Sequence, residues 1–120
     1  RRLHSTLRRF YGWLLDQVGN RFQLLVFADS AGAVDAATLA QFKSFAGDAI
    51  AVEPVVVTPS GGQMAGVTVL ADAQGLVARR YDAKPGTTYL IRPDQHVAAR
   101  WRSLDAARVR AAVARATGNA

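Results

Sequence analysis

The stretch FQLLVFA, residues 22–28, constrains the fold more than any other part of this sequence. It carries no charge, and polar residues bound it on both sides, with Asn20-Arg21 before it and Asp29-Ser30 after it. So short an apolar run, bounded in this way, is typical of a strand that is buried on both faces. We therefore expect a central strand in a sheet whose two faces are covered.

Residues 1–20 predict a helical extension before this strand. The segment opens with basic residues and then turns amphipathic, with Gly19-Asn20 as a suitable stop. The apolar residues that recur at helical spacing are Phe10, Trp13, Leu14 and Val18.

The segment DAATLAQFKSFAG predicts a second helix. Asp35 can accept hydrogen bonds from the free amides at its start, and Gly47 can adopt the left-handed conformation that ends it. Its buried face is expected to consist of Leu39, Phe42 and Ala46, with Phe45 beside them.

The tail, SLDAARVRAAVARATGNA, predicts the last helix. Ser103 can cap its start and Gly118 can end it, and Arg108 and Arg115 fall on the solvated face. The expected buried stripe consists of Ala106, Val109, Val113 and Ala116.

Further strands are expected between these helices. The run IAVEPVVVT, residues 50–58, predicts a second strand, in which Pro54 favours a bulge or an edge location. After the flexible loop PSGGQMAG come a short extended piece, a D-x-x-G turn and a short helix carrying Leu76, Val77 and Tyr81. TTYLIR and HVAARW predict a third and a fourth strand joined by a tight RPDQ turn.

This order of elements predicts an α/β fold of thioredoxin-like architecture. It consists of a mixed four-stranded sheet flanked by helices on both faces. Strands joined by a helix are expected to run parallel, whereas the RPDQ turn makes the last pair antiparallel. The length allows one domain, residues 1–120. Because the first residue is Arg1, we expect a fragment of a longer chain or a trimmed form of one.

Composition removes several classes of function. The sequence has no cysteine, which excludes a disulfide scaffold, a thiol nucleophile and cysteine-ligated zinc. A cytoplasmic location fits this, and neither a membrane span nor a secretory signal is visible. The net charge of +6 allows an anionic partner such as nucleic acid. The arginines are scattered along the sequence, however. This favours a general Ala- and Arg-rich composition as the source of the charge over a nucleic-acid-binding surface.

Several stretches resemble catalytic or binding motifs, and each has a simpler interpretation. In YLIRPDQHVAARW, Pro93 and Asp94 suit the second and third positions of a tight turn, so a hairpin explains Asp94 and His96 without catalysis. Ser30 stands where the thioredoxin architecture carries its C-x-x-C, and a hydrolytic Ser30 would need a base nearby. His4 and His96 are far apart in the sequence, and no carboxylates cluster beside them, so they make a poor metal site.

Two more stretches resemble binding motifs and also have simpler interpretations. PSGGQMAG has the glycines of a phosphate loop but lacks its Lys-Ser/Thr. RRFYGW mixes cations with aromatics, as nucleic-acid surfaces do, yet its aromatics fall at core-facing helical positions. Trp13 and Trp101 suit either a core or an interface.

Taken together, RFQLLVF and DAQGLVARRYDAKPGTTYLIRPDQHVAARW resemble the C-terminal domain of FAD-dependent aromatic-ring monooxygenases. These are enzymes of the phenol hydroxylase and 3-(3-hydroxyphenyl)propionate hydroxylase type. The resemblance spans residues 15–116, and its most specific part is the R-P-D hairpin with the upstream A-R-R-Y. In two places the sequence departs from the family pattern. Gln95 replaces the turn glycine, and Ala99 replaces a tryptophan, with Trp101 two positions later.

The resemblance implies a parent enzyme that hydroxylates a phenolic ring with FAD, NAD(P)H and O₂. Its N-terminal FAD-binding and substrate domains, in the same chain, would be the partners of this domain. The domain would have no catalytic, cofactor-binding or metal-binding residue, and would serve structural support or a homo-oligomer contact. Two alternatives remain: a free-standing binding module for an anionic partner, and a hydrolase using Ser30 or His96.

Overall fold

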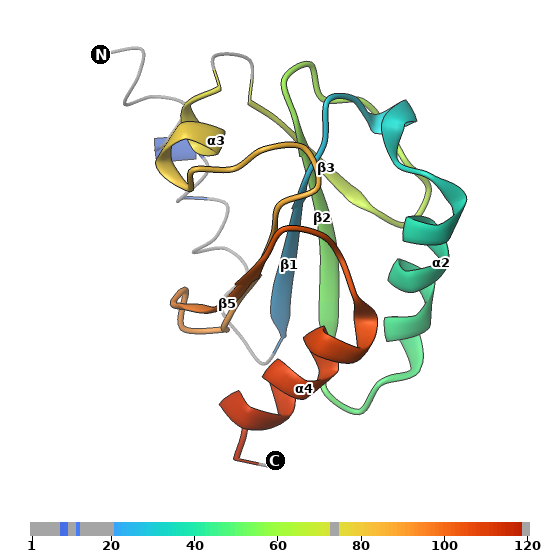
Figure 1. Cartoon of the computed structure of the whole chain (residues 1–120), viewed down its shortest axis with the longest axis vertical. Helices are drawn as coiled ribbons and strands as arrows, with labels where there is room; N and C mark the ends of the chain where they lie inside the picture. The colour runs from blue at the N-terminus through green and yellow to red at the C-terminus, as the bar shows by residue number, and fades with distance from the viewer. Residues whose placement is uncertain (1–7, 10–11, 13–20, 73–74, 119–120) are drawn as a thin grey trace.

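The computed structural model describes residues 8–9, 12, 21–72 and 75–118 (Figure 1). The expected helical stripe of Phe10, Trp13, Leu14 and Val18 lies outside these residues. In chain order the elements are β1 (Phe22–Phe27), the 3₁₀ turn η1 (Ala31–Ala33), α2 (Ala36–Ser44), the 3₁₀ turn η2 (Phe45–Gly47), β2 (Val52–Thr58), β3 (Thr68–Ala71), α3 (Leu76–Arg80), β4 (Thr88–Ile91), β5 (Val97–Trp101) and α4 (Ala106–Ala116).

The uncharged run at residues 22–28 forms the centre of the sheet, as predicted. All six residues of β1 are buried. The strand pairs in parallel with β2 and antiparallel with β4, within a five-stranded sheet of order β3-β2-β1-β4-β5. A strand with neighbours on both edges and helices over both faces has no room for charge, which explains the composition of the run.

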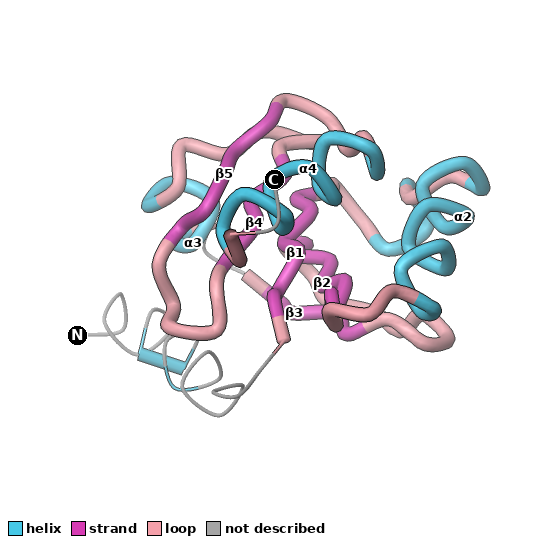
Figure 2. The backbone as a smooth tube through the Cα atoms, turned by 90° about the horizontal axis from the view of Figure 1, so that it is seen from below, coloured by secondary structure: helices cyan, strands magenta, loops and turns pink. Residues whose placement is uncertain are grey.

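The two faces of the sheet carry separate apolar clusters, because successive strand residues point to opposite sides. Phe22, Leu24 and Val26 pack with the buried side chains of α2, η2 and α4. Leu25 and Phe27 pack on the other face, with those of α3 and β4. Figure 2 shows α2 and α4 on one side of the strands and α3 on the other. Each fully buried aliphatic side chain contributes about 1.5–3 kcal/mol, so these clusters are the main source of stability.

The sheet has five strands, where the sequence predicted four. The short extended piece after the glycine loop is β3, which pairs in parallel with β2 from Val55 onward. The expectation that strands joined by a helix run parallel fails at β4. That strand lies antiparallel to β1, so it also opposes β2. The strand after β2 that lies parallel to it is β3, which the chain reaches through a loop.

Pro54 lies in an interior strand without a bulge, opposite Leu24. Because β3 pairs with β2 only from Val55 onward, β2 has a single neighbour at Pro54. The missing N–H therefore breaks no ladder hydrogen bond on the β3 side.

Two helix boundaries differ from expectation, the end of α2 and the start of α4. Asp35 caps α2 as predicted, with Oδ1 accepting from the Thr38 amide at 2.8 Å. The helix ends at Ser44 and continues as η2, and the φ of Gly47 is not positive. At α4 the cap is Asp105 instead of Ser103, whereas Gly118 has the predicted left-handed φ, +76°.

The buried helix faces are also shorter than predicted. Ala46 and Ala116 are both exposed. In α4 the buried residues are Val109, Ala112 and Val113. In the described part of the chain, no helix is long and apolar enough to cross a membrane.

Candidate functional site

The RPDQH turn joins β4 to β5 in the predicted hairpin. The Gln95 amide donates to the Arg92 carbonyl at 2.8 Å, and the Arg92 amide donates to the His96 carbonyl at 2.8 Å. The Asp94 carboxylate accepts from Arg92 Nη2 at 2.6 Å and from the His96 amide at 3.2 Å. The His96 side chain is 78% exposed, with Nδ1 3.3 Å from Asp94 Oδ1. Asp94 thus stabilises the turn in which it lies.

The pKa of Asp94 reflects these contacts. Partial burial raises the pKa, but the hydrogen bonds from His96 and the positive charges of Arg92 and His96 outweigh it. The pKa of Asp94 therefore lies below its usual value, so the carboxylate stays ionised and anchors the turn.

Ser30 lies at the other end of the sheet. It follows β1 and caps η1, with Oγ accepting from the Ala33 amide at 3.2 Å. The hairpin turn lies at the amino end of β1, since Ile91 pairs with Gln23 and Thr88 pairs with Val26. A strand of this length spans about 20 Å, so His96 cannot be the base for Ser30. Ser30 and His96 therefore cannot act together as the nucleophile and base of a hydrolase.

The glycine loop, residues 59–66, leads into a strand and not into a helix. Thr58 Oγ1 donates to the Gly61 carbonyl at 2.9 Å and closes the start of the loop. Gly61 has a φ of +73°, and a Cβ there would lie 3.1 Å from the Cβ of Ala71. A phosphate loop uses the N-terminus of the following helix, and β3 offers none.

The D-x-x-G motif is a helix cap. Asp72 is 3% exposed, and its carboxylate accepts from the Val77 amide at 3.1 Å and the Ala78 amide at 2.9 Å. Gly75 has a φ of +66°, which lets the chain turn into α3. The motif thus holds a short helix on the sheet.

The A-R-R-Y motif and the hairpin meet around Tyr89. The Tyr89 hydroxyl donates to the Tyr81 carbonyl, and the centroids of the two rings lie 4.9 Å apart. The Arg100 guanidinium lies 5.4 Å from the Tyr89 centroid and donates to the Asp82 carbonyl at 2.7 Å. The most specific residues of the resemblance are therefore packing contacts between α3, β4 and β5.

The second departure from the family pattern lies on the opposite face. Ala99 and Trp101 are both half-buried and pack against the α2–α4 cluster. Trp101 thus contributes to the core, whereas Trp13, His4 and most of RRFYGW lie outside the described residues.

Within the described residues, no three His, Cys, Asp or Glu side chains gather as metal ligands do.

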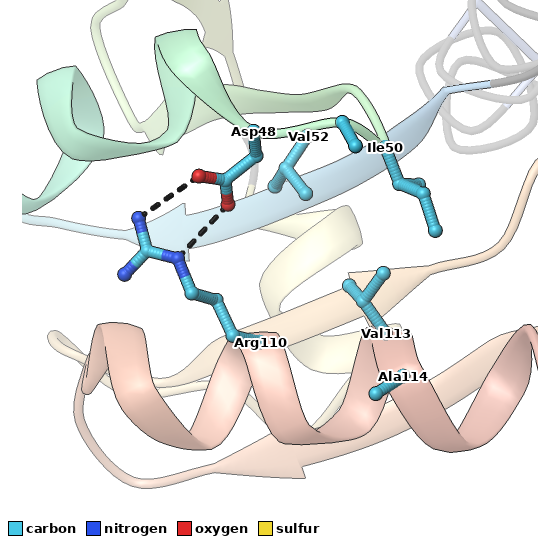
Figure 3. Close-up of a pocket in the computed structure, with 7 residues that line it drawn as sticks. Asp48, Ile50, Val52, Arg110, Val113 and Ala114 are labelled. Atoms are coloured by element: carbon cyan, nitrogen blue, oxygen red, sulfur yellow. Dashed lines mark hydrogen bonds and ion pairs between the residues drawn. The ribbon is translucent and has the colours of Figure 1, made fainter. Parts of the chain in front are cut away.

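Sequence reasoning missed a polar cluster centred on Arg110 of α4 (Figure 3). The guanidinium donates to Asp48 through Nε at 2.9 Å and through Nη2 at 3.3 Å. Nη2 also donates to the Ser44 carbonyl at 2.8 Å, and the guanidinium stacks 4.9 Å from the Phe45 ring centroid. We call these four residues the Arg110 clamp. A single sequence could place Arg110 beside the buried stripe of α4, but gives no sign of a partner so far away in the chain.

Beside the clamp lies an apolar groove of about 250 Å³. Figure 3 shows Ile50 and Val52 on one side of it and Val113 and Ala114 of α4 on the other. Its charged residues are Arg110 and Asp48, which already neutralise each other. The groove therefore offers contact area and no catalytic group.

Comparison with known proteins connects this geometry to a family. The family model of the HcaD C-terminal domain matches residues 10–116. The matched range encloses residues 15–116, which carry the resemblance drawn from the motifs. A comparison with curated proteins finds no match.

Three solved structures share the fold. An exposed lipoprotein thioredoxin of Streptococcus pneumoniae is 18% identical, with a TM-score of 0.58 over 82% of this chain and 88% of that chain. StoA of Bacillus subtilis is 18% identical, with a TM-score of 0.55 over 78% and 83% of the two chains. Aklavinone-11 hydroxylase in complex with FAD and aklavinone is 24% identical, with a TM-score of 0.55 over 83% of this chain. This chain spans 17% of that enzyme. The thioredoxin-like fold is confirmed.

Proposed function

Since the chain belongs to the HcaD C-terminal domain family, we propose that it is the C-terminal domain of an FAD-dependent monooxygenase that hydroxylates an aromatic ring. Its role there is structural support or subunit contact, without chemistry of its own. It is a C-terminal domain of the kind associated with FAD-dependent hydroxylase-type proteins. The observation that carries the proposal is the family match over residues 10–116, because it includes nearly every described element.

The likeness to thioredoxins does not extend to their chemistry. Disulfide exchange needs a thiolate, and the sequence has no cysteine. The position after β1 carries Ser30, whose hydroxyl caps a turn. A scaffold that keeps the fold and lacks the sulfur is suited to contact and not to redox chemistry.

FAD does not fit the groove beside the Arg110 clamp. Ligand pockets usually enclose about 300–1,000 Å³, and this groove encloses about 250 Å³. Its one basic side chain already binds Asp48 and Ser44. We propose that FAD, NAD(P)H and the aromatic substrate bind to the parts of the parent enzyme outside this chain.

The alternative of an anionic partner is less well supported. Among the residues that the structure describes, these arginines lie within 4.0 Å of a carboxylate, in the pairs Arg21–Glu53, Arg92–Asp94, Arg100–Asp82, Arg108–Asp105 and Arg110–Asp48. Such pairing lowers the field that would attract phosphate groups. Binding of RNA or DNA at micromolar levels, falling steeply with salt, would favour this alternative.

The first test uses the natural protein. An antibody raised against this chain isolates its parent from the source, whose mass and visible spectrum are then recorded. We expect a chain several times longer than this one, with flavin absorption bands and NAD(P)H oxidation stimulated by a phenol. A colourless chain of about this length would overturn the proposal.

The second test uses the chain alone. We expect no reduction of insulin disulfides and no retention of FAD on gel filtration. The thioredoxin-like fold makes an intact thioredoxin the positive control for the first assay. FAD retained by the isolated chain would contradict the assignment of the cofactor to the rest of the parent.

A further inference from the structure

Met64 carries the one sulfur atom of this chain, because the sequence has a single methionine and no cysteine. The residue lies in the glycine loop, residues 59–66, between β2 and β3. A thioether is the side-chain group that a mild oxidant attacks first in a chain without thiols. Any chemistry of sulfur in this chain therefore takes place in that loop.

The contacts of Met64 hold the loop against the sheet. Its half-buried side chain packs, with Val67 and Val69, against the α2–α4 cluster. The Val67 amide donates to the Met64 carbonyl at 3.2 Å, and the two residues form an isolated antiparallel bridge. Since β3 begins at Thr68, directly after Val67, Met64 anchors the start of this strand.

A small oxidant can reach the Met64 side chain. Met64, Val67 and Val69 line a hollow of about 510 Å³ that is open to solvent. The volume is ample for hydrogen peroxide, which is little larger than a water molecule, at about 30 Å³. Oxidation of methionine follows exposure, so a half-buried thioether beside an open hollow is a reactive one.

We propose that Met64 is a reversible oxidation site through which a hydroperoxide loosens the glycine loop and β3. The sulfur lone pair attacks one peroxide oxygen, so that an S–O bond forms and the O–O bond breaks. The proton on the attacked oxygen passes to the oxygen that leaves, and hydrogen peroxide thus yields water. The thioether loses one electron pair and becomes a sulfoxide, and the peroxide is reduced by the same pair.

The sulfoxide fits the contacts of Met64 poorly. It is polar, whereas Val67 and Val69 are apolar, and a polar oxygen without a hydrogen bond is costly away from water. The backbone does not hold the loop by itself, because glycines with positive φ lie on both sides of Met64, Gly62 at +130° and Gly66 at +74°. We therefore infer that the oxidised side chain turns to solvent and the loop follows it.

The loosening extends to β3 and α3. Within the described sheet β3 is an edge strand, with β2 as its one neighbour, so the loop is an important part of its support. Directly after β3 comes Asp72, whose carboxylate caps α3 through the amides of Val77 and Ala78. This inference does not rest on the proposed function, because it needs only a hydroperoxide and residues of this chain.

Access to the sulfur is tested with hydrogen peroxide, added to the folded chain and to the same chain in urea. Mass spectrometry of peptides follows the uptake of one oxygen atom at Met64. We expect the folded chain to react at a rate within about tenfold of the unfolded one, because oxidation follows exposure. Much stronger protection of the folded chain would overturn the proposal.

The structural effect is measured on the fully oxidised chain by urea titration and hydrogen exchange. We expect the urea midpoint to fall by about 0.5 M or more, and the amides of β3 to exchange faster than before oxidation, with less change in β4. Reductases for the two sulfoxide epimers should restore both readings. An oxidised chain with an unchanged midpoint and unchanged exchange would overturn the loosening.

Two variants separate the sulfur from other targets of peroxide. Met64→Leu keeps an apolar side chain, and its urea midpoint should not move after the same treatment. An equal fall in Met64→Leu would place the damage elsewhere and overturn the proposal. Met64→Gln carries a polar group of similar length, and should show the lower midpoint and faster β3 exchange without peroxide. A Met64→Gln chain as stable as Met64→Leu would contradict the effect of polarity at this position.

Discussion

At the scale of single residues, Gln95 holds a backbone conformation that normally belongs to glycine. Its φ is +68°, in the left-handed region. A three-residue hairpin loop commonly has glycine there, because a Cβ is strained in this region. Two backbone hydrogen bonds, from Gln95 to Arg92 and from Arg92 to His96, close the turn around it. The turn therefore keeps its shape and tolerates glutamine.

Gln95→Gly should consequently stabilise the domain. Removing the Cβ relieves a strain of about 1–2 kcal/mol, and the added freedom of the unfolded chain costs about 0.4–1 kcal/mol. We expect a net gain of about 0.5–1 kcal/mol in the free energy of unfolding, measured by urea titration. Gln95→Ala is the control, and should give no gain because alanine retains the Cβ. An equal gain in both variants would show that the strain is not at this φ.

Asp35 gives the domain a dependence on pH. Hydrogen bonds from the Thr38 amide and hydroxyl lower the pKa of Asp35, although partial burial raises it. A carboxyl with a lower pKa in the folded state stabilises the fold above its unfolded pKa of about 3.9. That contribution is lost as the pH falls through the folded value.

Asp35→Asn keeps an acceptor oxygen for Thr38 but does not titrate. Between about pH 6 and about pH 3, its urea midpoint should therefore fall less than that of the unsubstituted protein. Parallel curves for the two proteins would contradict this account of the cap.

At the scale of elements, the sequence was informative where a signal is local. The uncharged run, the Asp35 cap and the RPDQ hairpin were all predicted correctly, because composition, capping and turn chemistry act over a few residues. The pairing of β3 with β2 and the antiparallel direction of β4 were not predicted. Strand pairing depends on contacts between residues that are far apart in the sequence. The Arg110 clamp was not predicted either, because its residues are also far apart in the sequence. The place of His96 in a turn was predicted, whereas the capping role of Ser30 and the separation of the two residues by the length of β1 were not.

The start of α4 offers a direct test of a wrong boundary. The Asp105 carboxylate accepts from the amides of Ala107 at 3.0 Å and Arg108 at 3.3 Å, whereas Ser103 lies outside the helix. Asp105→Ala should cost about 1 kcal/mol, and Ser103→Ala about nothing, both measured by thermal unfolding. The reverse order would restore the serine cap that the sequence suggested.

At the scale of the whole molecule, the Arg110 clamp joins the last helix to the junction between η2 and β2. It combines a two-pronged ion pair, a bond to the Ser44 carbonyl and stacking on Phe45. Both Arg110 and Asp48 keep part of their side chains in water, at 41% and 26% exposure, so solvent screens the pair. The geometry nevertheless fixes α4 across the α2 face.

Arg110→Ala should lower the free energy of unfolding by about 1–2 kcal/mol, from the lost charged hydrogen bonds and stacking. Arg108→Ala is the matched control on the same helix. Its guanidinium lies 3.9 Å from Asp105 and is 70% exposed, so we expect a change below about 0.5 kcal/mol. Equal losses in the two variants would mean that the clamp adds nothing beyond general surface charge.

The position of β1 at the centre of the sheet also has a consequence for biosynthesis. Within this domain β1 is made well before one of its two neighbours, β4, which consists of residues 88–91. A ribosome adds about 5–20 residues per second, so for several seconds the most apolar strand of the growing chain has an open edge. Such edges attract other strands. The interval between the synthesis of β1 and that of β4 is therefore when a nascent chain of this kind most needs a chaperone.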